Sequence, residues 1–242
     1  MVWQKFVVAS ASVAIAFSPV LESTAQAAQL NYSKMYVFGD SLSDTGNIYN
    51  SFPQNFPAYY DNGRFSNGKN WIDYLSEDLG LTTNTFVTQP NTYLPAPQIL
   101  TESVNFAFGG ATTGLDNTVS TLAPGLQQQV GTYLNILQAT NQTADPNALY
   151  ILWAGANDYL YTYSNWFTPY KDPNQPIGNI SWALNSLLQA GAKNVAVANL
   201  PSLGNLPLSG IFGTEYQTGL NNLTQLHNSQ LQQTISGLSQ SY

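Results

Sequence analysis

The stretch MYVFGDS at residues 35–41 passes from four apolar residues to a glycine, an acid and a serine. A short apolar run that ends at a glycine is typical of a strand buried on both faces of a sheet. The serine then follows the carboxyl end of that strand, where the loops of parallel α/β folds form the binding crevice. We therefore expect Ser41 to lie at the edge of a parallel sheet.

Three further apolar runs have the same form, and four helical patterns alternate with them. The runs are at residues 104–108, 149–153 and 195–200. The helical patterns are at residues 71–79, 126–137, 177–188 and 216–238. Strands that alternate with helices indicate parallel βαβ units with helices on both faces of the sheet. We expect the remaining long stretches to be irregular, namely residues 42–68, 81–101, 159–176 and 201–214.

Composition narrows the class of protein. The chain has 242 residues, six Lys and Arg, thirteen Asp and Glu, one His and no Cys, for a net charge of −7. Hydrophobic residues make up 43%, enough for a sizeable core, and the length suits a single α/β domain. So few basic residues do not suit nucleic acid, because phosphate binding needs clustered Lys and Arg. The absence of Cys excludes disulfides, one His excludes a multi-histidine metal site, and we expect no cofactor.

The first 27 residues have the layout of a secretory signal peptide. Lys5 precedes an apolar stretch at residues 6–17, and Ala25 and Ala27 provide small residues at the two positions that a signal peptidase recognises. The apolar run is shorter than the roughly 20 residues that a membrane-spanning helix needs, and no later segment is apolar enough. We therefore expect cleavage before Ala28, a secreted or periplasmic product and no stable membrane span, rather than a membrane anchor.

Three strand ends carry residues suited to acyl transfer. Ser41 follows the first strand, Gly109 and Gly110 follow the second, and Asn157 and Asp158 follow the third. Taken one at a time, these are more typical of a serine helix cap, a tight glycine turn and an Asx turn. Because all three lie at the same edge of one parallel sheet, together they favour a nucleophilic serine with two converging oxyanion donors.

The same residues resemble the conserved blocks of a known family. The run FGDSLSDTGN at residues 38–47 resembles the first block of the GDSL family, also called SGNH hydrolases. The run GRFSNG at 63–68, followed by Trp71, resembles a signature of its secreted lipase and esterase branch, and residues 105–111 and 155–158 resemble the second and third blocks. The resemblance implies a three-layer α/β/α sandwich around a parallel, flavodoxin-like sheet, and ester hydrolysis without a metal.

The resemblance also implies roles for individual residues. Ser41 is expected to be the nucleophile, and the Ser41 N–H, the Gly110 N–H and the Asn157 side chain to form the oxyanion hole. Gly110 is preferred to Gly109 because it lies five residues after Asn105, as in the family pattern. The implied route is attack by Ser41, a tetrahedral oxyanion, an acyl-enzyme and attack by water. The small-molecule substrate stays open among a lipid, an aryl ester and an acylated carbohydrate.

The last block of the family, an Asp-x-x-His sequence that supplies the catalytic base, has no match in this chain. The single histidine, His227, has Thr224 three residues before it and falls on the apolar stripe of the helix at 216–238. We therefore expect His227 to be a packed structural residue, and the domain at residues 28–242 to lack the last strand and the Asp/His loop. Three alternatives follow: the nucleophile and oxyanion half of a secreted ester hydrolase, an inactive lipid- or glycan-binding protein, and a gene fragment.

Structural roles are expected for several other side chains. Asp44 and Asn47 are expected to order the first loop by Asx hydrogen bonds, and Asp158 to brace the third block. Arg64, the sole arginine, is expected to form a buried or bidentate pair. The loop after Asn157 is rich in aromatic rings, which either form a wall of the ester site or pack the loop onto the domain. These rings are Tyr159, Tyr161, Tyr163, Trp166, Phe167 and Tyr170.

Overall fold

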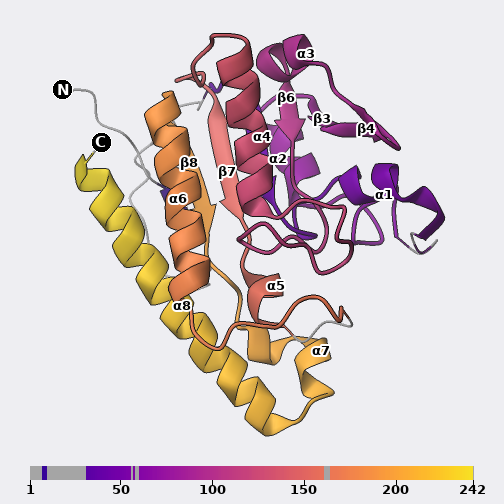
Figure 1. The fold of residues 1–242 in the computed structure, drawn as a ribbon, viewed down its shortest axis with the longest axis vertical. Helices are drawn as coiled ribbons and strands as arrows, with labels where there is room; N and C mark the ends of the chain where they lie inside the picture. Colours follow the sequence, from indigo (N-terminus) through magenta and orange to yellow (C-terminus); the bar gives the residue numbers. More distant parts are fainter. Residues whose placement is uncertain (1–6, 10–30, 56, 58–59, 161–163, 242) are drawn as a thin grey trace, which may run out of the picture.

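The computed structural model describes residues 7–9, 31–55, 57, 60–160 and 164–241 (Figure 1). Within these residues the main sheet has six strands in the order β1-β8-β7-β2-β6-β3, and all neighbouring pairs are parallel. A separate antiparallel hairpin joins β4 to β5. The strands are β1 (Val7–Ala9), β2 (Met35–Gly39), β3 (Thr83–Thr85), β4 (Val87–Gln89), β5 (Thr92–Tyr93), β6 (Ser103–Asn105), β7 (Leu149–Trp153) and β8 (Asn194–Ala198).

Helices connect the strands and flank the sheet. They are α1 (Asn47–Ser51), α2 (Trp71–Asp78), α3 (Ala96–Thr101), α4 (Leu126–Ala139), α5 (Ala156–Tyr159), α6 (Asn174–Ala190), α7 (Pro207–Gly210) and α8 (Thr214–Ser241), with 3₁₀ turns at Pro53–Asn55 and Leu203–Asn205. None of the helices in the described ranges combines the length and the apolar character needed to cross a membrane.

The sheet separates two layers of helices, because successive side chains of β2 point to opposite faces. Tyr36 and Phe38 belong to a large apolar core with α4, α6 and the C-terminal half of α8. Met35 and Val37 pack in a second core with α2. Figure 1 shows α4 and α6 in front of the sheet and α2 behind it. The expected α/β/α sandwich around a parallel sheet is therefore confirmed.

Strand β6, which the sequence predicts at residues 104–108, ends earlier than predicted. It ends at Asn105 and not at residue 108, because the Asn105 side chain turns back and its Oδ1 accepts the Ala107 N–H at 2.9 Å. The chain nevertheless stays beside β2, since the Phe108 N–H donates to the Gly39 carbonyl at 3.0 Å. The prediction of a regular strand over 104–108 is thus wrong at its end, although its position next to β2 is right.

Three of the stretches expected to be irregular contain regular elements. Residues 42–68 include α1, residues 81–101 include β3, the β4–β5 hairpin and α3, and residues 201–214 include α7. Strand β3 escaped prediction because its sequence, TNT, has no apolar run, and it needs none as an edge strand whose residues are only half-buried.

The expected signal peptide falls mostly outside the described residues. Of residues 1–27 only Val7–Ala9 are described, as strand β1. This strand pairs with β8 in parallel, with Val7 opposite Ala196 and Ala9 opposite Ala198. The expected cut before Ala28 also lies outside the described residues, so the signal peptide stays a prediction.

The three predicted blocks leave the sheet at one edge. Gly39 at the end of β2 is in register with Trp153 at the end of β7, and the Asp40 N–H donates to the Trp153 carbonyl at 3.2 Å. The end of β6 lies on the other side of β2. Beyond this edge, α5 and the N-terminal part of α8 share a separate apolar cluster, below the sheet in Figure 1. The first, second and third blocks therefore start side by side.

Candidate active site

Gly39, two residues before Ser41, is held by a side chain that sequence reasoning missed. Its N–H donates to Gln129 Oε1 at 2.8 Å, and its carbonyl accepts from Gln129 Nε2 at 2.9 Å. A Cβ at position 39 would lie 2.3 Å from the Trp153 carbonyl oxygen, so only glycine fits. Gln129 is buried on α4 between Leu126 and Val130, and a polar residue within that apolar stripe was the available signal.

Ser41 lies half-buried in the turn that follows β2. The Leu42 N–H donates to Asp40 Oδ1 at 3.0 Å, and the Ser43 and Asp44 N–H groups donate to the Asp40 carbonyl at 3.1 and 3.0 Å. The three N–H groups that follow Ser41 are therefore committed. The Ser41 N–H itself has no acceptor among the described residues.

Gly110 supplies a second uncommitted N–H at the end of the neighbouring block. Its φ of +81° is in the left-handed region, and a Cβ there would lie 2.6 Å from Asn117 Oδ1. Its carbonyl accepts the Thr118 N–H at 2.8 Å, whereas its N–H has no acceptor in the described part of the chain. The Gly109 N–H, by contrast, donates to Asp44 Oδ2 at 2.8 Å. Of the two glycines, Gly110 is thus the one with a free donor.

The third block is bound to the loop that follows Gly110. Half-buried Asn157 donates from Nδ2 to the Ala111 carbonyl at 3.0 Å, which uses one of its two amide hydrogens. The next residue, Asp158, is fully buried and accepts from the Thr113 N–H at 2.9 Å and from Thr113 Oγ1 at 2.6 Å. The expectation that Asp158 braces this block is confirmed.

Asp44 orders the first loop, as expected from its position. Its Oδ1 accepts the Gly46 and Asn47 N–H groups at 2.8 and 2.7 Å. Its Oδ2 accepts the Ile48 N–H at 3.2 Å, in addition to the Gly109 N–H. One carboxylate thereby joins the start of α1 to the glycine block.

Asn47 ties the same loop to two other segments. Its Nδ2 donates to the Asn105 and Ala107 carbonyls, both at 2.8 Å. Its Oδ1 accepts the Val87 N–H at 2.8 Å. Because Asn47 is completely buried, every polar atom of its side chain must find a partner inside the protein.

Three buried carboxyl groups surround the turn at Ser41. Burial raises the pKa of Asp40 to about 7, and the nearby charge of Asp44 adds to the rise. Burial also raises the pKa of Asp158 to about 7, against the hydrogen bonds from Thr113. For Asp44, burial raises the pKa to about 6 although its N–H donors oppose the shift. In the described residues no group of three His, Asp or Glu side chains has the arrangement of a metal site.

His227 is a buried structural residue, as predicted. It lies on α8 with no exposed surface, and its Nδ1 is hydrogen-bonded to the Tyr159 hydroxyl at 2.8 Å. Its Nε2 has no partner among the described residues. Burial lowers the pKa of His227 to about 4. A Cβ on Gly155 would lie 3.0 Å from Cε1 of the ring, so the His227 ring packs directly against the start of the third block.

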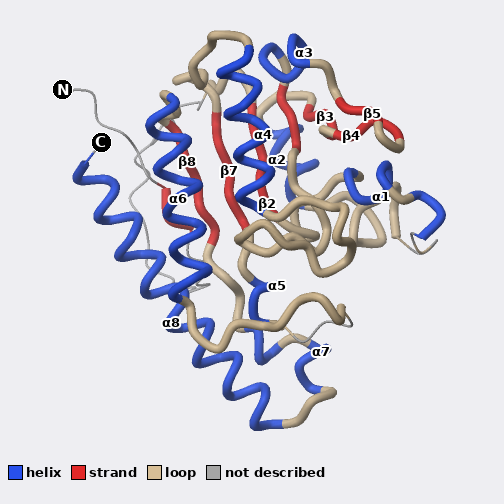
Figure 2. The backbone as a smooth tube through the Cα atoms, in the orientation of Figure 1, coloured by secondary structure: helices blue, strands red, loops and turns tan. Residues whose placement is uncertain are grey.

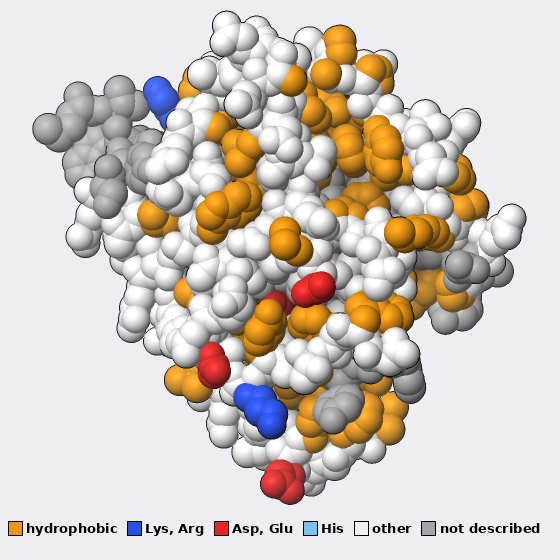
Figure 3. All heavy atoms as spheres, viewed as in Figure 1, with side chains coloured by type: hydrophobic (Ala, Val, Ile, Leu, Met, Phe, Trp, Pro, Cys, Tyr) orange, Lys and Arg blue, Asp and Glu red, His pale blue; other side chains and the backbone are white. Residues whose placement is uncertain are grey.

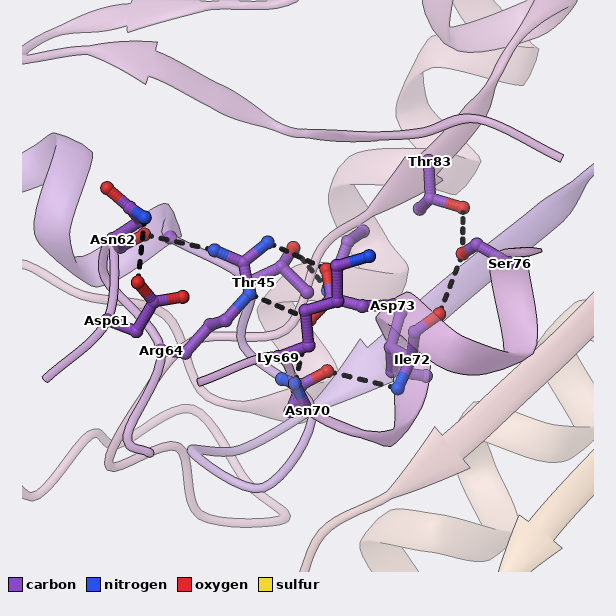
Figure 4. A network of polar contacts seen from close by, with 12 residues as sticks. Thr45, Asp61, Asn62, Arg64, Lys69, Asn70, Ile72, Asp73, Ser76 and Thr83 are labelled. Atoms are coloured by element: carbon purple, nitrogen blue, oxygen red, sulfur yellow. Dashed lines mark hydrogen bonds and ion pairs between the residues drawn. The ribbon is translucent and has the colours of Figure 1, made fainter. Parts of the chain in front are cut away.

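Arg64 forms the bidentate pair that was expected of the only arginine. Its Nε donates to Asp73 Oδ2 and its Nη2 to Asp73 Oδ1, both at 2.7 Å (Figure 4). Asp73 Oδ2 also accepts the Asn70 N–H at 2.8 Å, while Asn70 Oδ1 accepts the Ile72 N–H and caps α2. The pair therefore fixes the loop before α2 to the first turn of that helix.

The aromatic loop packs onto the domain at several points. Trp166 Nε1 donates to the Asn117 carbonyl at 2.9 Å, and the Phe167 and Tyr170 ring centroids are 5.8 Å apart. Tyr159 and Tyr170 also line a cavity of about 480 Å³ beside α8, so these two rings form a wall of that cavity as well as packing onto the domain. Tyr161 and Tyr163 lie outside the described residues.

A serine and an uncommitted glycine N–H at the carboxyl edge of a parallel sheet are features shared with serine-dependent α/β hydrolases. Residues 35–241 match the sequence profile of the GDSL-like lipase/acylhydrolase family, and the chain belongs to this family.

Two relatives by sequence agree with this assignment. A phosphatidylcholine-sterol acyltransferase of Aeromonas hydrophila is 34% identical over 185 residues, which cover 73% of this chain and 47% of the relative. An Arabidopsis thaliana GDSL esterase/lipase is 29% identical, covering 89% of this chain and 66% of the relative. The chain thus spans about half to two thirds of the length of these relatives. A solved structure of a lipolytic G-D-S-L family protein from Veillonella parvula aligns with a TM-score of 0.42 at 13% identity, covering 84% of this chain and 73% of that one.

Proposed function

We propose that the chain carries the nucleophile and oxyanion half of a carboxylic ester hydrolase. The supporting observation is the pair of free N–H groups at Ser41 and Gly110, in a region where the neighbouring N–H groups, including that of Gly109, are committed. An oxyanion hole needs donors that have no other acceptor until the charge develops. The esterase, lipase and acyltransferase names of the relatives support the same reaction class.

In the proposed reaction, Ser41 Oγ attacks the ester carbonyl carbon and the π electrons move onto the carbonyl oxygen. The N–H groups of Ser41 and Gly110 and the free amide hydrogen of Asn157 stabilise this oxyanion. Its collapse releases the alcohol and leaves an acyl group on Ser41, which water then removes as the acid. A base takes the Ser41 proton and returns it to the departing alkoxide. This base is not His227, whose ring has no exposed surface.

The test separates acylation of Ser41 from the supply of a base. The chain is incubated with p-nitrophenyl acetate and added imidazole, and acetylation is followed by intact-mass spectrometry and peptide mapping. We expect one acetyl group on Ser41, and turnover above the rate with imidazole alone that Ser41→Ala abolishes. Ser43→Ala is the matched control, because the Ser43 Oγ is buried without a partner and its loss should change little. Equal turnover by Ser41→Ala and wild type would overturn the proposal.

A second candidate function is non-catalytic binding of a lipid or a glycan. One observation favours it: His227, the only histidine in the sequence, is completely buried and hydrogen-bonded to Tyr159. This candidate predicts saturable ligand binding that Ser41→Ala leaves unchanged, with no acetylation of Ser41 in the presence of imidazole. Acetylated Ser41 would rule it out.

We also propose that residues 1–27 direct export and are removed before Ala28. The support is the sequence pattern of a charged start, an apolar run and small residues at the cut. Expression with the native leader in a bacterial host, followed by N-terminal sequencing of the exported protein, tests this. A mature chain that begins at Ala28 is expected, and retention of Met1 in the exported protein would contradict the proposal.

A further inference from the structure

A cleft of about 570 Å³ lies between α4 and the β4–β5 hairpin, and Figure 3 shows hydrophobic side chains gathered in this region. In Figure 2 the hairpin lies to the right of α4, with α1 below it. The cleft is lined by Ser51, Phe86, Tyr93, Phe108, Leu122, Pro124, Gln128, Gly131, Thr132 and Asn135. All of these lining residues come from the part of the chain between α1 and the C-terminal half of α4.

One wall of the cleft is aromatic. The Phe86 and Tyr93 ring centroids are 5.1 Å apart, and Phe86 stacks on buried Phe106 at 4.9 Å. Tyr93 is 55% exposed, so this supported pair of rings is open to a ligand. A rigid aromatic surface gains dispersion energy from any flat or gently curved C–H face laid against it.

The opposite wall is a polar stripe of α4. Gln128, Thr132 and Asn135 are spaced four and three residues apart, which places them on one face of the helix. Within the described residues, Gln128 Nε2 and the Asn135 amide have no protein partner. The residues that line the cleft include no charged side chain. The wall therefore offers uncommitted neutral donors and acceptors.

We propose that this cleft binds a neutral carbohydrate, and that the ester cleaved at Ser41 is an acylated carbohydrate. The assignment rests on the proposed ester hydrolysis and selects among its substrates. A carbohydrate presents C–H faces to the aromatic wall and hydroxyl groups to the amides. A fatty acyl chain would desolvate Gln128 and Asn135 without replacing their hydrogen bonds to water, which disfavours it. An ionic ligand would find no opposite charge.

A second cavity provides the contrast. The cavity of about 480 Å³ beside α8 is lined mainly by apolar and aromatic side chains, including Leu220, Leu223 and Tyr216. Its lining also includes Lys171 and Asn222, but most of it suits an apolar group, and it lacks the row of three polar side chains found on α4. The two sites therefore differ in the chemistry of the ligand that each can hold.

The cleft at α4 is also close to the candidate oxyanion hole. Phe108 lines the cleft and lies two residues before Gly110, and two residues span at most about 7 Å. Leu122 lines it from the loop that carries Val119, whose side chain lies beside Gly110. The cleft therefore borders the segment that carries the Gly110 N–H.

Glycines on three helices allow a matched test. A Cβ at Gly131, Gly178 or Gly219 would meet no other atom within 4 Å, so a larger side chain can start at each position without a clash. Gly131→Leu fills the cleft at α4, Gly219→Leu fills the cavity beside α8, and Gly178→Leu on α6 fills neither. Binding of xylohexaose, cellohexaose, maltohexaose and dodecanoate to the full chain is measured by titration calorimetry.

We expect saturable binding of at least one of the three oligosaccharides, weakened about tenfold or more by Gly131→Leu, equal to about 1.4 kcal/mol. Gly178→Leu and Gly219→Leu should leave that binding unchanged. The proposal is overturned if no oligosaccharide binds, if Gly131→Leu binds as wild type does, or if Gly131→Leu abolishes binding of dodecanoate alone. Because this measurement needs no turnover, its failure is distinguishable from a failure of Ser41 to become acetylated.

Discussion

Replacing Asn47 with alanine tests whether a single buried amide holds the first loop to the glycine block. The substitution removes the partner of the Ala107 carbonyl and of the Val87 N–H, while the Asn105 carbonyl keeps the Phe86 N–H at 3.0 Å. Two buried polar groups are then unpaired, at about 1–3 kcal/mol each. We expect the free energy of unfolding to fall by about 2–6 kcal/mol, a large share of the about 5–15 kcal/mol that stabilises a typical domain.

The assay is urea unfolding at constant pH, followed by tryptophan fluorescence, with the free energy taken by linear extrapolation. Asn222→Ala is the control, because Asn222 is exposed on α8 and the same change there should stay within about 0.7 kcal/mol of wild type. Asn47→Asp keeps the volume but turns an oxygen toward the Asn105 and Ala107 carbonyls, so it should destabilise at least as much as Asn47→Ala. If Asn47→Ala and Asn222→Ala have equal stability, the loop does not depend on this amide.

Three further outcomes are expected. Arg64→Lys should lower the free energy of unfolding by about 1 kcal/mol, since lysine cannot form the paired bonds to Asp73, and the loss should shrink in concentrated NaCl; equal stability in low salt would contradict this. Burial raises the pKa of Asp40 from 3.8 to about 7, so the wild-type protein loses stability as the pH rises across that interval. In urea titrations, Asp40→Asn should therefore become progressively more stable than wild type as the pH rises. A difference in stability that does not change with pH would contradict this. His227→Ala should lower the unfolding free energy by about 2–3 kcal/mol, while soluble protein keeps the acetylation of Ser41; loss of acetylation in folded protein would assign His227 a catalytic role.

The central strands and long helices could be predicted because their apolar periodicity is required by burial. The runs at 35–38, 149–153 and 195–200 match β2, β7 and β8 closely, and all four long helices are present. The shorter elements carry no such pattern. Strand β3 is a half-buried edge with the sequence TNT. Helix α1 has only five residues, and its first N–H groups donate to the Asp44 carboxylate.

In the candidate site, too, some residues could be predicted from the sequence and others could not. Ser41, Gly110 and Asn157 could be named because each follows a strand that periodicity places in one sheet. Their supports could not, since they depend on contacts between distant segments. Gln129 reaches Gly39 across 90 residues of sequence, and Asp44 reaches Gly109 across 65. A buried glutamine in an apolar stripe shows that a partner must exist, but the sequence does not identify it.

Helix α4 has three consecutive glutamines, and the last two have separate roles. Gln129 grips both backbone groups of Gly39 at 2.8 and 2.9 Å, while Gln128 faces the cleft. One residue of helix rises 1.5 Å, so a slide of that size would break both bonds to Gly39. The face of α4 that lines the cleft and the strand that precedes Ser41 are consequently held in fixed positions relative to each other. A shift of either one would shift the other.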